Sequence, residues 1–127
     1  MISSWRKLFS SFIFAFSGIV TTFKSEQNFR IHTMVSVIVI GLAVALDFSN
    51  ERFIILLIVI GLVLTLELVN TAIEKTVDLI TKEYHPLAKK AKDAAAGAVL
   101  VFSIFAVIIG ILLFIEPLIN SINSVKG

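Results

Sequence analysis

Charged residues are spread unevenly along the chain, and the long gaps between them carry the strongest structural signal. Three uncharged and mostly apolar gaps stand out, at residues 31–46, 53–66 and 94–115. A helix needs about 20 apolar residues to cross a bilayer. The third gap is long enough, and the first two become long enough when the residues that flank them are included in the helix. The pattern predicts membrane-spanning helices at 29–48, 53–73 and 94–115, with the second helix continuing to about residue 82.

Polar or helix-breaking segments separate the three predicted spans. Residues 47–52 form a polar hairpin in this interpretation, and Tyr84-His85-Pro86 interrupts the second helix. Proline lacks the backbone N–H and disfavours helical geometry in the residue before it. Residues 117–127 are expected to form a polar tail. A chain of this length has room for a single membrane domain, residues 1–127.

Residues 3–24 carry a different pattern from the predicted spans. Apolar and aromatic side chains recur there on one helical stripe, at Trp5, Leu8, Phe9, Phe12, Ile13, Phe16, Ile19, Val20 and Phe23. Serines and threonines lie largely off that stripe, which favours an amphipathic helix in the membrane surface. A fourth span is one alternative. A signal peptide, with Ala15-Phe16-Ser17 as a small-residue cleavage site, is the other.

The positions of lysine and arginine predict how the spans are oriented, because these residues are enriched in cytoplasmic loops. With three spans, Arg52 and Lys126 fall on one side of the membrane. The other side receives Arg6, Lys7, Lys24, Arg30, Lys75, Lys82, Lys89, Lys90 and Lys92. We therefore expect the N-terminus and residues 75–92 to face the cytoplasm, and the C-terminus to lie outside.

Composition narrows the class further. The chain is 57% hydrophobic and 16% charged, and its mean hydropathy is +1.00, whereas soluble domains are about 45–50% apolar and about 25% charged. The absence of cysteine excludes a disulfide scaffold. A net charge of +2 gives no reason to expect a nucleic-acid partner. The sequence predicts an all-α integral membrane protein.

Four polar residues on the second predicted helix share one face. Glu67, Asn70, Glu74 and Asp78 point within a fan of about 80° at 100° per residue. Surface acids on a solvated helix end would fit Asp78, and could extend to Glu74, but they fit Glu67 poorly because apolar residues surround it. A carboxylate near the bilayer core costs several kcal/mol unless it is paired or neutralised. We therefore expect a divalent cation here, since carboxylate oxygens are ligands that magnesium prefers, or a general base.

Other charged positions leave two interpretations open. Lys92 and Asp93 precede the third span, where Asp93 could cap a helix or the pair could meet a phosphate and a metal. Glu26 and Arg30 have the spacing of a helix salt bridge, and Glu26 could also join the acids of the second helix. His32 fits a packed polar residue better than a ligand, and His85 could contact a nucleotide or cap the break.

The run Glu67-Leu68-Val69-Asn70-Thr71-Ala72-Ile73-Glu74-Lys75-Thr76-Val77-Asp78 closely resembles the signature of the prokaryotic diacylglycerol kinase family, E-x-x-N-[ST]-[AS]-I-E-x-x-V-D. The resemblance extends to Glu83-Tyr84-His85, to Ala91-Lys92-Asp93 and to Glu26 with Phe29-Arg30, and so covers nearly the whole chain. It implies a homotrimer in the bacterial cell membrane, with a surface helix and three spans per subunit. Active sites would lie between subunits at the cytoplasmic interface.

The resemblance also implies roles for individual residues in the transfer of phosphate from ATP, with Mg²⁺, to a lipid hydroxyl. Glu67 resembles the general base and lipid contact, with Arg30 beside it, and Glu26 and Glu74 resemble the metal ligands. The implied ATP site comprises Glu26, Asn70, Glu74, Asp78, Glu83, Tyr84, His85, Lys92 and Asp93. Such a transfer needs mainly positioning and charge neutralisation.

Ile31-His32 after Arg30, and Pro86 after His85, resemble the Gram-positive branch of the family, in which several members prefer undecaprenol. We therefore expect an undecaprenol kinase, with diacylglycerol as the alternative substrate. Two other classes compete. A small proton-coupled multidrug transporter would use one membrane carboxylate, and a non-catalytic membrane adaptor would not need converging acids. The sequence lacks the phosphate-binding loops of soluble nucleotide folds.

Overall fold

The computed structural model describes residues 2–127, with side chains from residue 3, and this part of the chain folds into helices joined by short turns. The helices are α1 (Ile2–Ser25), α2 (Gln27–Ala45), α3 (Asn50–Ile80) and α4 (Pro86–Lys126). Each is long and apolar enough to cross a membrane. The all-helical membrane class is therefore confirmed.

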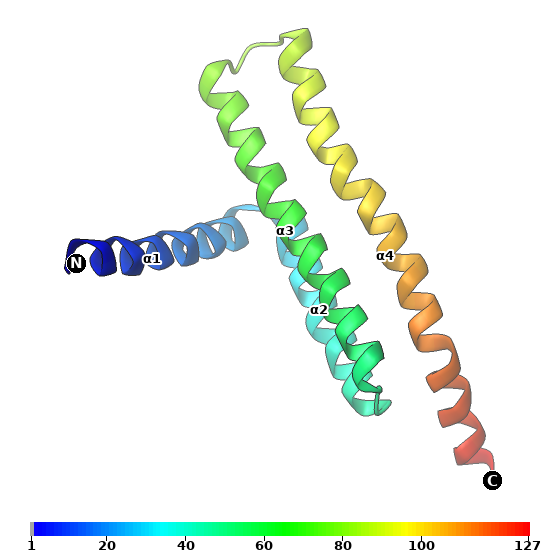
Figure 1. Cartoon of the computed structure of the whole chain (residues 1–127). Coiled ribbons are helices and arrows are strands. Elements are labelled where there is room, and N and C mark those ends of the chain that lie inside the picture. The colour runs from blue at the N-terminus through cyan, green and yellow to red at the C-terminus, as the bar shows by residue number, and fades with distance from the viewer. Residues whose placement is uncertain (1) are drawn as a thin grey trace.

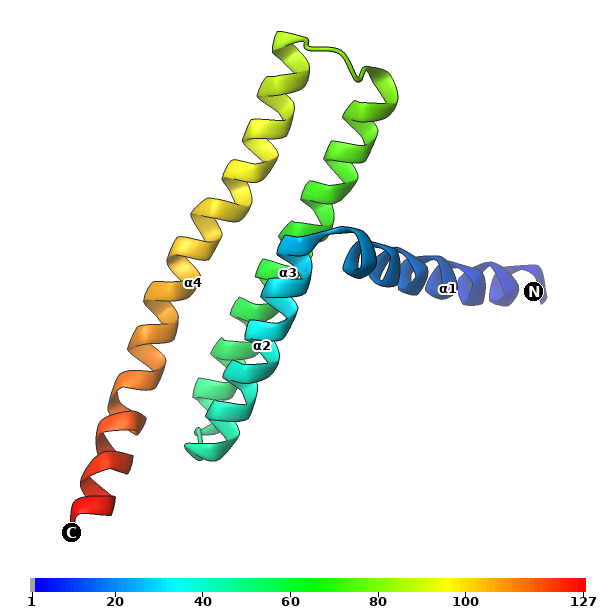
Figure 2. The ribbon, with the colours of Figure 1, turned by 180° about the vertical axis from the view of Figure 1, so that it is seen from behind.

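Three of these helices form a bundle, and the remaining one leaves it sideways (Figures 1 and 2). Helices α2, α3 and α4 run side by side, each antiparallel to the next, whereas α1 projects across their direction from the start of α2. Helix α3 contacts each of the other three helices. Both α3 and α4 continue beyond the level at which α1 joins α2, so the paired ends of these two helices project past the plane of α1.

The buried core lies at the turn between α2 and α3. Phe48 of this turn packs against Phe53 and Phe114, with ring centroids 6.0 Å and 4.6 Å apart. Asp47 adopts a left-handed backbone with φ of 55°, a conformation that aspartate tolerates better than most residues. Helix α2 therefore ends at Ala45, and Phe48, the last residue of the first predicted span, lies in the turn.

The segment expected to form a polar tail, residues 117–127, is helical almost to its end, because α4 continues to Lys126 with Pro117 inside it. Proline has no N–H to donate to the carbonyl four residues earlier, which here belongs to Leu113. The guanidinium of Arg52, at the start of α3, donates Nη1–H to that carbonyl oxygen at 2.6 Å. It also pairs with Glu116 at 2.9 Å. A distant residue thus replaces the missing helical hydrogen bond.

The break between α3 and α4 lies where the sequence predicts it. Helix α3 ends at Ile80, close to the expected limit, and His85 is the N-cap of α4. Its ring Nδ1 accepts a hydrogen bond from the Leu87 N–H at 3.1 Å, and Pro86 occupies the first turn, where its missing N–H is not needed. His85 therefore caps the break, one of its two expected roles.

Most apolar side chains face outward. Trp5, Phe9, Phe12 and Phe16 of α1 are each 68–70% exposed, and large apolar residues of α2, α3 and α4 are exposed as well. Apolar surface of this extent is rare on soluble monomers and marks contact with lipid or with other protein. The interfacial position of α1 remains a prediction, and its direction across the bundle is the one that such a position requires.

Candidate active site

Glu67 is the most deeply buried acid of the described chain, 4% exposed in the middle of α3. Its Oε1 lies 3.3 Å from Nε2 of His32 on α2. An ionised carboxylate removed from water costs several kcal/mol unless hydrogen bonds or charges compensate it. His32 supplies that compensation from the neighbouring helix, so the side chain that the sequence treats as a packed polar residue is the direct partner of the predicted base.

Two further predicted residues lie close to Glu67 and add negative charge. Glu26 and Glu74 are near enough for their charges to interact with the Glu67 carboxylate. Glu26 stands at the junction of α1 and α2, where Ser25 Oγ donates to its Oε1 at 3.2 Å and Lys75 Nζ lies 3.5 Å away. The fold therefore brings the three predicted acids into one region, which we call the carboxylate cluster (Glu26, Glu67 and Glu74).

Asn70 borders the carboxylate cluster and has an unsatisfied polar atom. Its Nδ2 donates to Glu74 Oε1 at 3.4 Å, whereas its Oδ1 is buried and has no hydrogen-bond partner within the described part of the chain. Such atoms are rare in folded proteins and call for an explanation. This amide oxygen is free to accept a hydrogen bond or to ligate a hard cation beside the Glu74 carboxylate.

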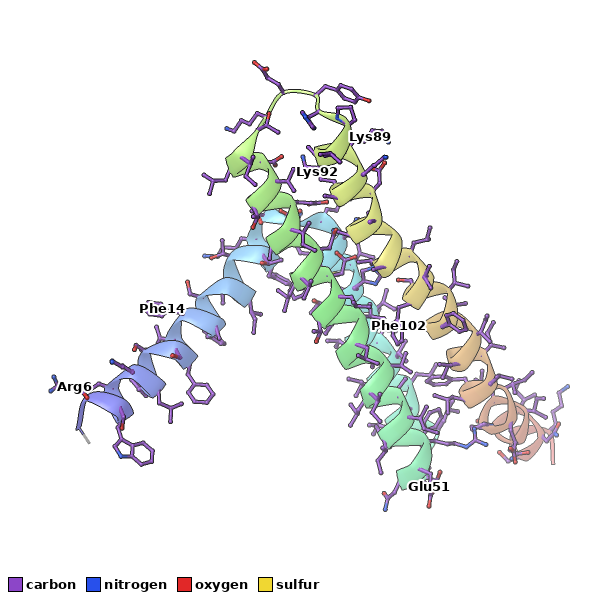
Figure 3. The ribbon with its side chains drawn as sticks, turned by 45° about the horizontal axis from the view of Figure 1, so that its top comes forward. Arg6, Phe14, Glu51, Lys89, Lys92 and Phe102 are labelled. Carbon is purple, nitrogen blue, oxygen red and sulfur yellow. The ribbon has the colours of Figure 1, made fainter. Side chains whose placement is uncertain are left out.

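The remaining charged site residues form a separate group near the α3–α4 break, and Figure 3 labels Lys89 and Lys92 there. Lys92 donates to Asp78 and Lys89 donates to Asp93. Asp78 lies beyond the predicted span, and its hydrogen bond from Lys92 holds the pKa of this carboxyl below its ordinary value. Because a helix rises about 1.5 Å per residue, Asp78 lies about 16 Å along α3 from Glu67.

Asp93 is not a helix cap, because α4 begins at Pro86, well before it. Of the other predicted nucleotide contacts, Tyr84 is 80% exposed, and Glu83 uses its backbone N–H to reach Thr81 Oγ1 at 3.2 Å. Within the described structure, the contacts of these residues stay at the break and do not reach the carboxylate cluster. Glu83, Tyr84, His85 and Asp93 are exposed at the α3–α4 break, outside the carboxylate cluster, and we call them the exposed rim.

Arg30 does not pair with Glu26 as the spacing suggests. Its Nη1 instead donates to the carbonyl oxygens of Phe23 and Lys24, at 3.0 Å and 2.8 Å, at the end of α1. A cation is favourable at a helix C-terminus, where the last carbonyls lack partners. Arg30 therefore fixes the bend that carries α1 away from the bundle, close to the carboxylate cluster.

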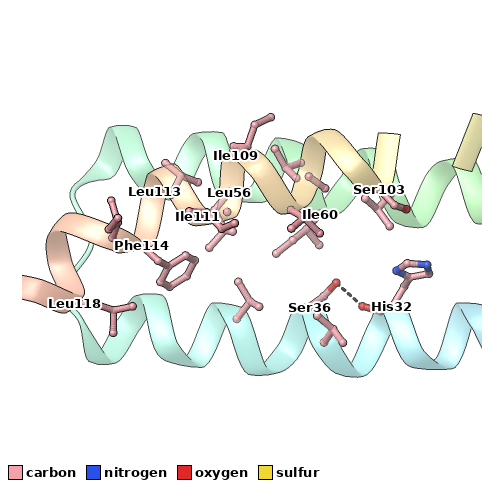
Figure 4. A pocket seen from close by; sticks show the side chains of 18 residues that line it. His32, Ser36, Leu56, Ile60, Ser103, Ile109, Ile111, Leu113, Phe114 and Leu118 are labelled. Atoms are coloured by element: carbon pink, nitrogen blue, oxygen red, sulfur yellow. Dashed lines mark hydrogen bonds between the residues drawn. The ribbon is translucent and has the colours of Figure 1, made fainter. Parts of the chain in front are cut away.

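An apolar groove of about 510 Å³ runs along α2, α3 and α4 and is bounded at one end by His32 (Figure 4). Leu56, Ile60 and Leu113 are among the side chains that line it, and Ser36 and Ser103 are its few polar members. The Ser36 hydroxyl already donates to the His32 carbonyl at 2.6 Å. The groove therefore offers a hydrocarbon-like surface that leads to the partner of Glu67.

The donor set suits a hard cation, although it does not form a complete cage. Among residues 2–127, no three His, Cys, Asp or Glu side chains converge as a metal-binding group. Magnesium usually binds through one or two carboxylates together with water and substrate phosphates. Glu26 and Glu74, with the free amide oxygen of Asn70, supply oxygen ligands of this kind and stay the predicted ligands.

Sequence reasoning missed His32 and Lys75 as site residues. Counted from the turn between α2 and α3, His32 and Glu67 lie at depths that differ by only about one helical turn. Comparing depths across the predicted hairpin would have paired them. The sequence assigns Lys75 no role in the site, because its pairing with Glu26 depends on the α1–α2 bend, which has no sequence signature.

Comparisons with known proteins cover nearly the whole bundle. The family model described as prokaryotic diacylglycerol kinase matches residues 13–114. The chain is 46% identical to an undecaprenol kinase of Bacillus subtilis, over 89% of this chain and 92% of that protein. It is 46% identical to a diacylglycerol kinase of Synechocystis, over 93% and 70% of the two chains. A diacylglycerol kinase of Escherichia coli is 34% identical over 75% and 78%.

Proposed function

The chain belongs to the prokaryotic diacylglycerol kinase family, and we propose that it transfers the γ-phosphate of ATP to the hydroxyl of undecaprenol in the bacterial cell membrane. One observation carries the proposal: the buried Glu67 carboxylate faces His32, which bounds an apolar groove. A lipid chain in that groove would bring its head to an acidic group. This arrangement favours a lipid kinase over the transporter and adaptor alternatives.

Glu67 acts as the general base in this proposal. The lipid hydroxyl oxygen attacks the γ-phosphorus, the bond to the β-phosphate oxygen breaks, and ADP leaves. The hydroxyl proton passes to the Glu67 carboxylate. General base catalysis of this kind contributes about 10²–10⁴-fold to a rate, and the burial of Glu67 keeps bulk water from competing for the phosphoryl group.

The nucleotide site extends from the carboxylate cluster toward the α3–α4 break. Glu26 and Glu74, supported by Asn70, would hold Mg²⁺, which neutralises phosphate charge when it is bound. Lys92 and Asp78 hold the ends of α4 and α3 together. The exposed rim of Glu83, Tyr84, His85 and Asp93 lies where the base and sugar of ATP could rest, outside the apolar part of the bundle.

Membrane placement follows from the same arrangement. We propose that α1 lies in the cytoplasmic surface of the membrane and that α2, α3 and α4 span it, with the C-terminus outside. The direction of α1 across the bundle and the many basic residues near the α3–α4 break support this orientation. Arg30 holds α1 in this position, and its predicted lipid contact would come from the same bend.

We also propose a homotrimer with active sites shared between subunits. A single three-helix bundle does not bury the carboxylate cluster completely, since the side chains of Glu26 and Glu74 are both partly exposed. Large apolar side chains remain exposed along all three bundle helices. Neighbouring copies would cover part of this surface and could complete the site.

Diacylglycerol is the second candidate substrate. The Synechocystis relative, a diacylglycerol kinase, is as similar to this chain as the Bacillus undecaprenol kinase is, at 46% identity. We favour undecaprenol because the match to the Bacillus protein spans 92% of its length. The groove near His32 is almost entirely apolar, which suits a polyprenol chain that has no ester groups.

A direct assay tests the proposal. Purified protein in lipid nanodiscs is incubated with ATP labelled at the γ-phosphate, Mg²⁺, and either undecaprenol or diacylglycerol. Labelled undecaprenyl phosphate is the expected product, and the label should be absent when Mg²⁺ is chelated. Faster labelling of diacylglycerol would reverse the choice of substrate, and no label in either lipid would overturn the kinase assignment.

A further inference from the structure

We propose that His32 is a positioning residue for the phosphoryl transfer, which holds the Glu67 carboxylate in the orientation that meets the lipid hydroxyl. The inference rests on the proposed role of Glu67 as the base. Its geometric support is the 3.3 Å separation of His32 Nε2 and Glu67 Oε1 across the α2–α3 interface. Among the described residues, His32 is the side chain that pairs with Glu67.

The burial of the two partners differs in a way that matters for this role. The Glu67 side chain is 5% exposed, whereas the His32 side chain is 30% exposed. His32 also lines the apolar groove, and Glu67 does not. The imidazole therefore stands between the groove and the carboxylate, and its position controls which face of the carboxylate an incoming head group can approach.

Hydrogen-bond chemistry defines the contact. An ionised carboxylate only accepts hydrogen bonds, and a neutral imidazole carries its proton on one nitrogen. In this proposal, Nε2 carries the proton and presents it to Oε1 of Glu67 across the 3.3 Å separation. The contact leaves Oε2 as the oxygen that accepts the proton of the lipid hydroxyl, so the base is presented in one orientation only.

The neighbours of His32 do not compete for this contact. The hydroxyl of Thr33 donates to the Phe29 carbonyl at 2.7 Å, and that of Ser36 donates to the His32 carbonyl at 2.6 Å. Both hydroxyls are thus satisfied within α2. Glu26 and Glu74 repel the Glu67 carboxylate and cannot donate to it when ionised, so among the titratable groups that interact with it the imidazole is the available donor.

Three variants separate this role from a packing role. His32→Leu keeps the apolar bulk and removes the donor. His32→Gln places an amide N–H near the position of Nε2. Thr33→Val is the matched control, because it removes a neighbouring hydroxyl that bonds within its own helix. All three are compared with the parent protein for kcat and KM toward undecaprenol and ATP, in the same nanodiscs.

We expect His32→Leu to lower kcat by about 10–100-fold with both KM values changed less than about twofold, because the lost contact orients the base and not the substrates. His32→Gln should recover most of kcat, and Thr33→Val should match the parent. Full activity of His32→Leu overturns the proposal. So does a His32→Gln protein as slow as His32→Leu, since that result would require the ring itself.

A double variant distinguishes failure of this inference from failure of the proposed base. If His32 acts through Glu67, then adding His32→Leu to Glu67→Gln should produce no further loss of kcat. A further loss of about tenfold or more would show an independent role and overturn the inference. Should Glu67→Gln alone keep full activity, the base assignment fails, whatever the His32 variants do.

Discussion

Arg52 and Glu67 are both charged side chains of α3 that face a neighbouring helix, but their surroundings differ. Arg52 pairs with Glu116 and donates to the Leu113 carbonyl, which Pro117 leaves without its helical N–H partner. Glu67 pairs with His32 and has two further acids nearby. We call the two regions the Arg52 end and the Glu67 end of the bundle. Polar contacts stabilise the fold at the Arg52 end, whereas negatively charged side chains lie close together at the Glu67 end.

The contrast gives a criterion for separating structural from functional polar groups inside a membrane bundle. At the Arg52 end, the polar contacts repair the defect that Pro117 creates in α4. At the Glu67 end, Asn70 Oδ1 is buried without a partner in the described structure, and like charges are gathered. Proteins retain such unfavourable arrangements mainly where chemistry requires them.

The strongest test of the contrast removes one carboxylate at each end. Glu67→Gln should lower kcat by about 10²–10⁴-fold, since the amide cannot accept the hydroxyl proton. Glu116→Gln is the matched control and should keep kcat within about twofold, because its exposed pair with Arg52 contributes at most about 1 kcal/mol to stability. Labelled phosphate transfer measures both. Equal losses in the two variants would remove the distinction between the ends.

The next test concerns the Arg52 end and uses a double-mutant cycle with Pro117. Arg52→Met should destabilise the protein by about 1.5–3 kcal/mol, because it leaves the Leu113 carbonyl without a donor. In the Pro117→Ala background, the new alanine supplies the missing backbone N–H, and the same substitution of Arg52 should cost about 1 kcal/mol less. Unfolding by sodium dodecyl sulfate, followed by circular dichroism, measures these differences.

A cycle with no coupling between the two positions would contradict this account of α4. It would mean that Arg52 stabilises the bundle through Glu116 alone. The kinase activity of the folded single variants should stay near that of the parent, because Arg52 lies at the start of α3, about 22 Å along that helix from Glu67, and contacts α4 near Pro117.

Much of the fold could be predicted from the sequence because its signals are local. Long apolar gaps predict the helices of the bundle, and the proline after His85 predicts the break between α3 and α4. The stripe from Glu67 to Asp78 lies on one helix, as its spacing requires. These features depend on periodicity and on proline chemistry, which act over a few residues.

The features that could not be predicted depend on partners that local rules do not pair. Pro117 lies inside a helix because Arg52, on a different helix, takes the place of its missing N–H. Arg30 turns to the end of α1 and not to Glu26, although Glu26 has the spacing of a helix salt bridge. Local rules assign both residues wrongly, since the energy of each contact depends on tertiary geometry.

Asn70 offers a test in which stability and activity should move in opposite directions. Asn70→Leu removes a buried acceptor that has no partner in the described structure, so the free energy of unfolding should stay level or rise by about 1 kcal/mol. Activity should fall by about tenfold, because the amide supports Glu74. Thermal unfolding and phosphate transfer are measured on the same preparation. A variant that loses both stability and activity would make Asn70 a structural residue.

The smallest expected effect lies at the α3–α4 break and depends on pH. The hydrogen bond from Lys92 lowers the pKa of Asp78 below its ordinary value of 3.8. A lowered folded-state pKa stabilises the protein at pH values above the ordinary one, and this contribution disappears as the pH falls through the folded-state pKa. The parent protein should therefore be slightly more stable than Asp78→Asn near pH 6, and the difference should vanish below about pH 3. Unfolding midpoints of the two proteins across this range measure it. A difference that persists at the lowest pH would show that the Asp78 side chain holds α3 against α4 by packing or neutral hydrogen bonding, so that charge would matter at the carboxylate cluster and not at the break.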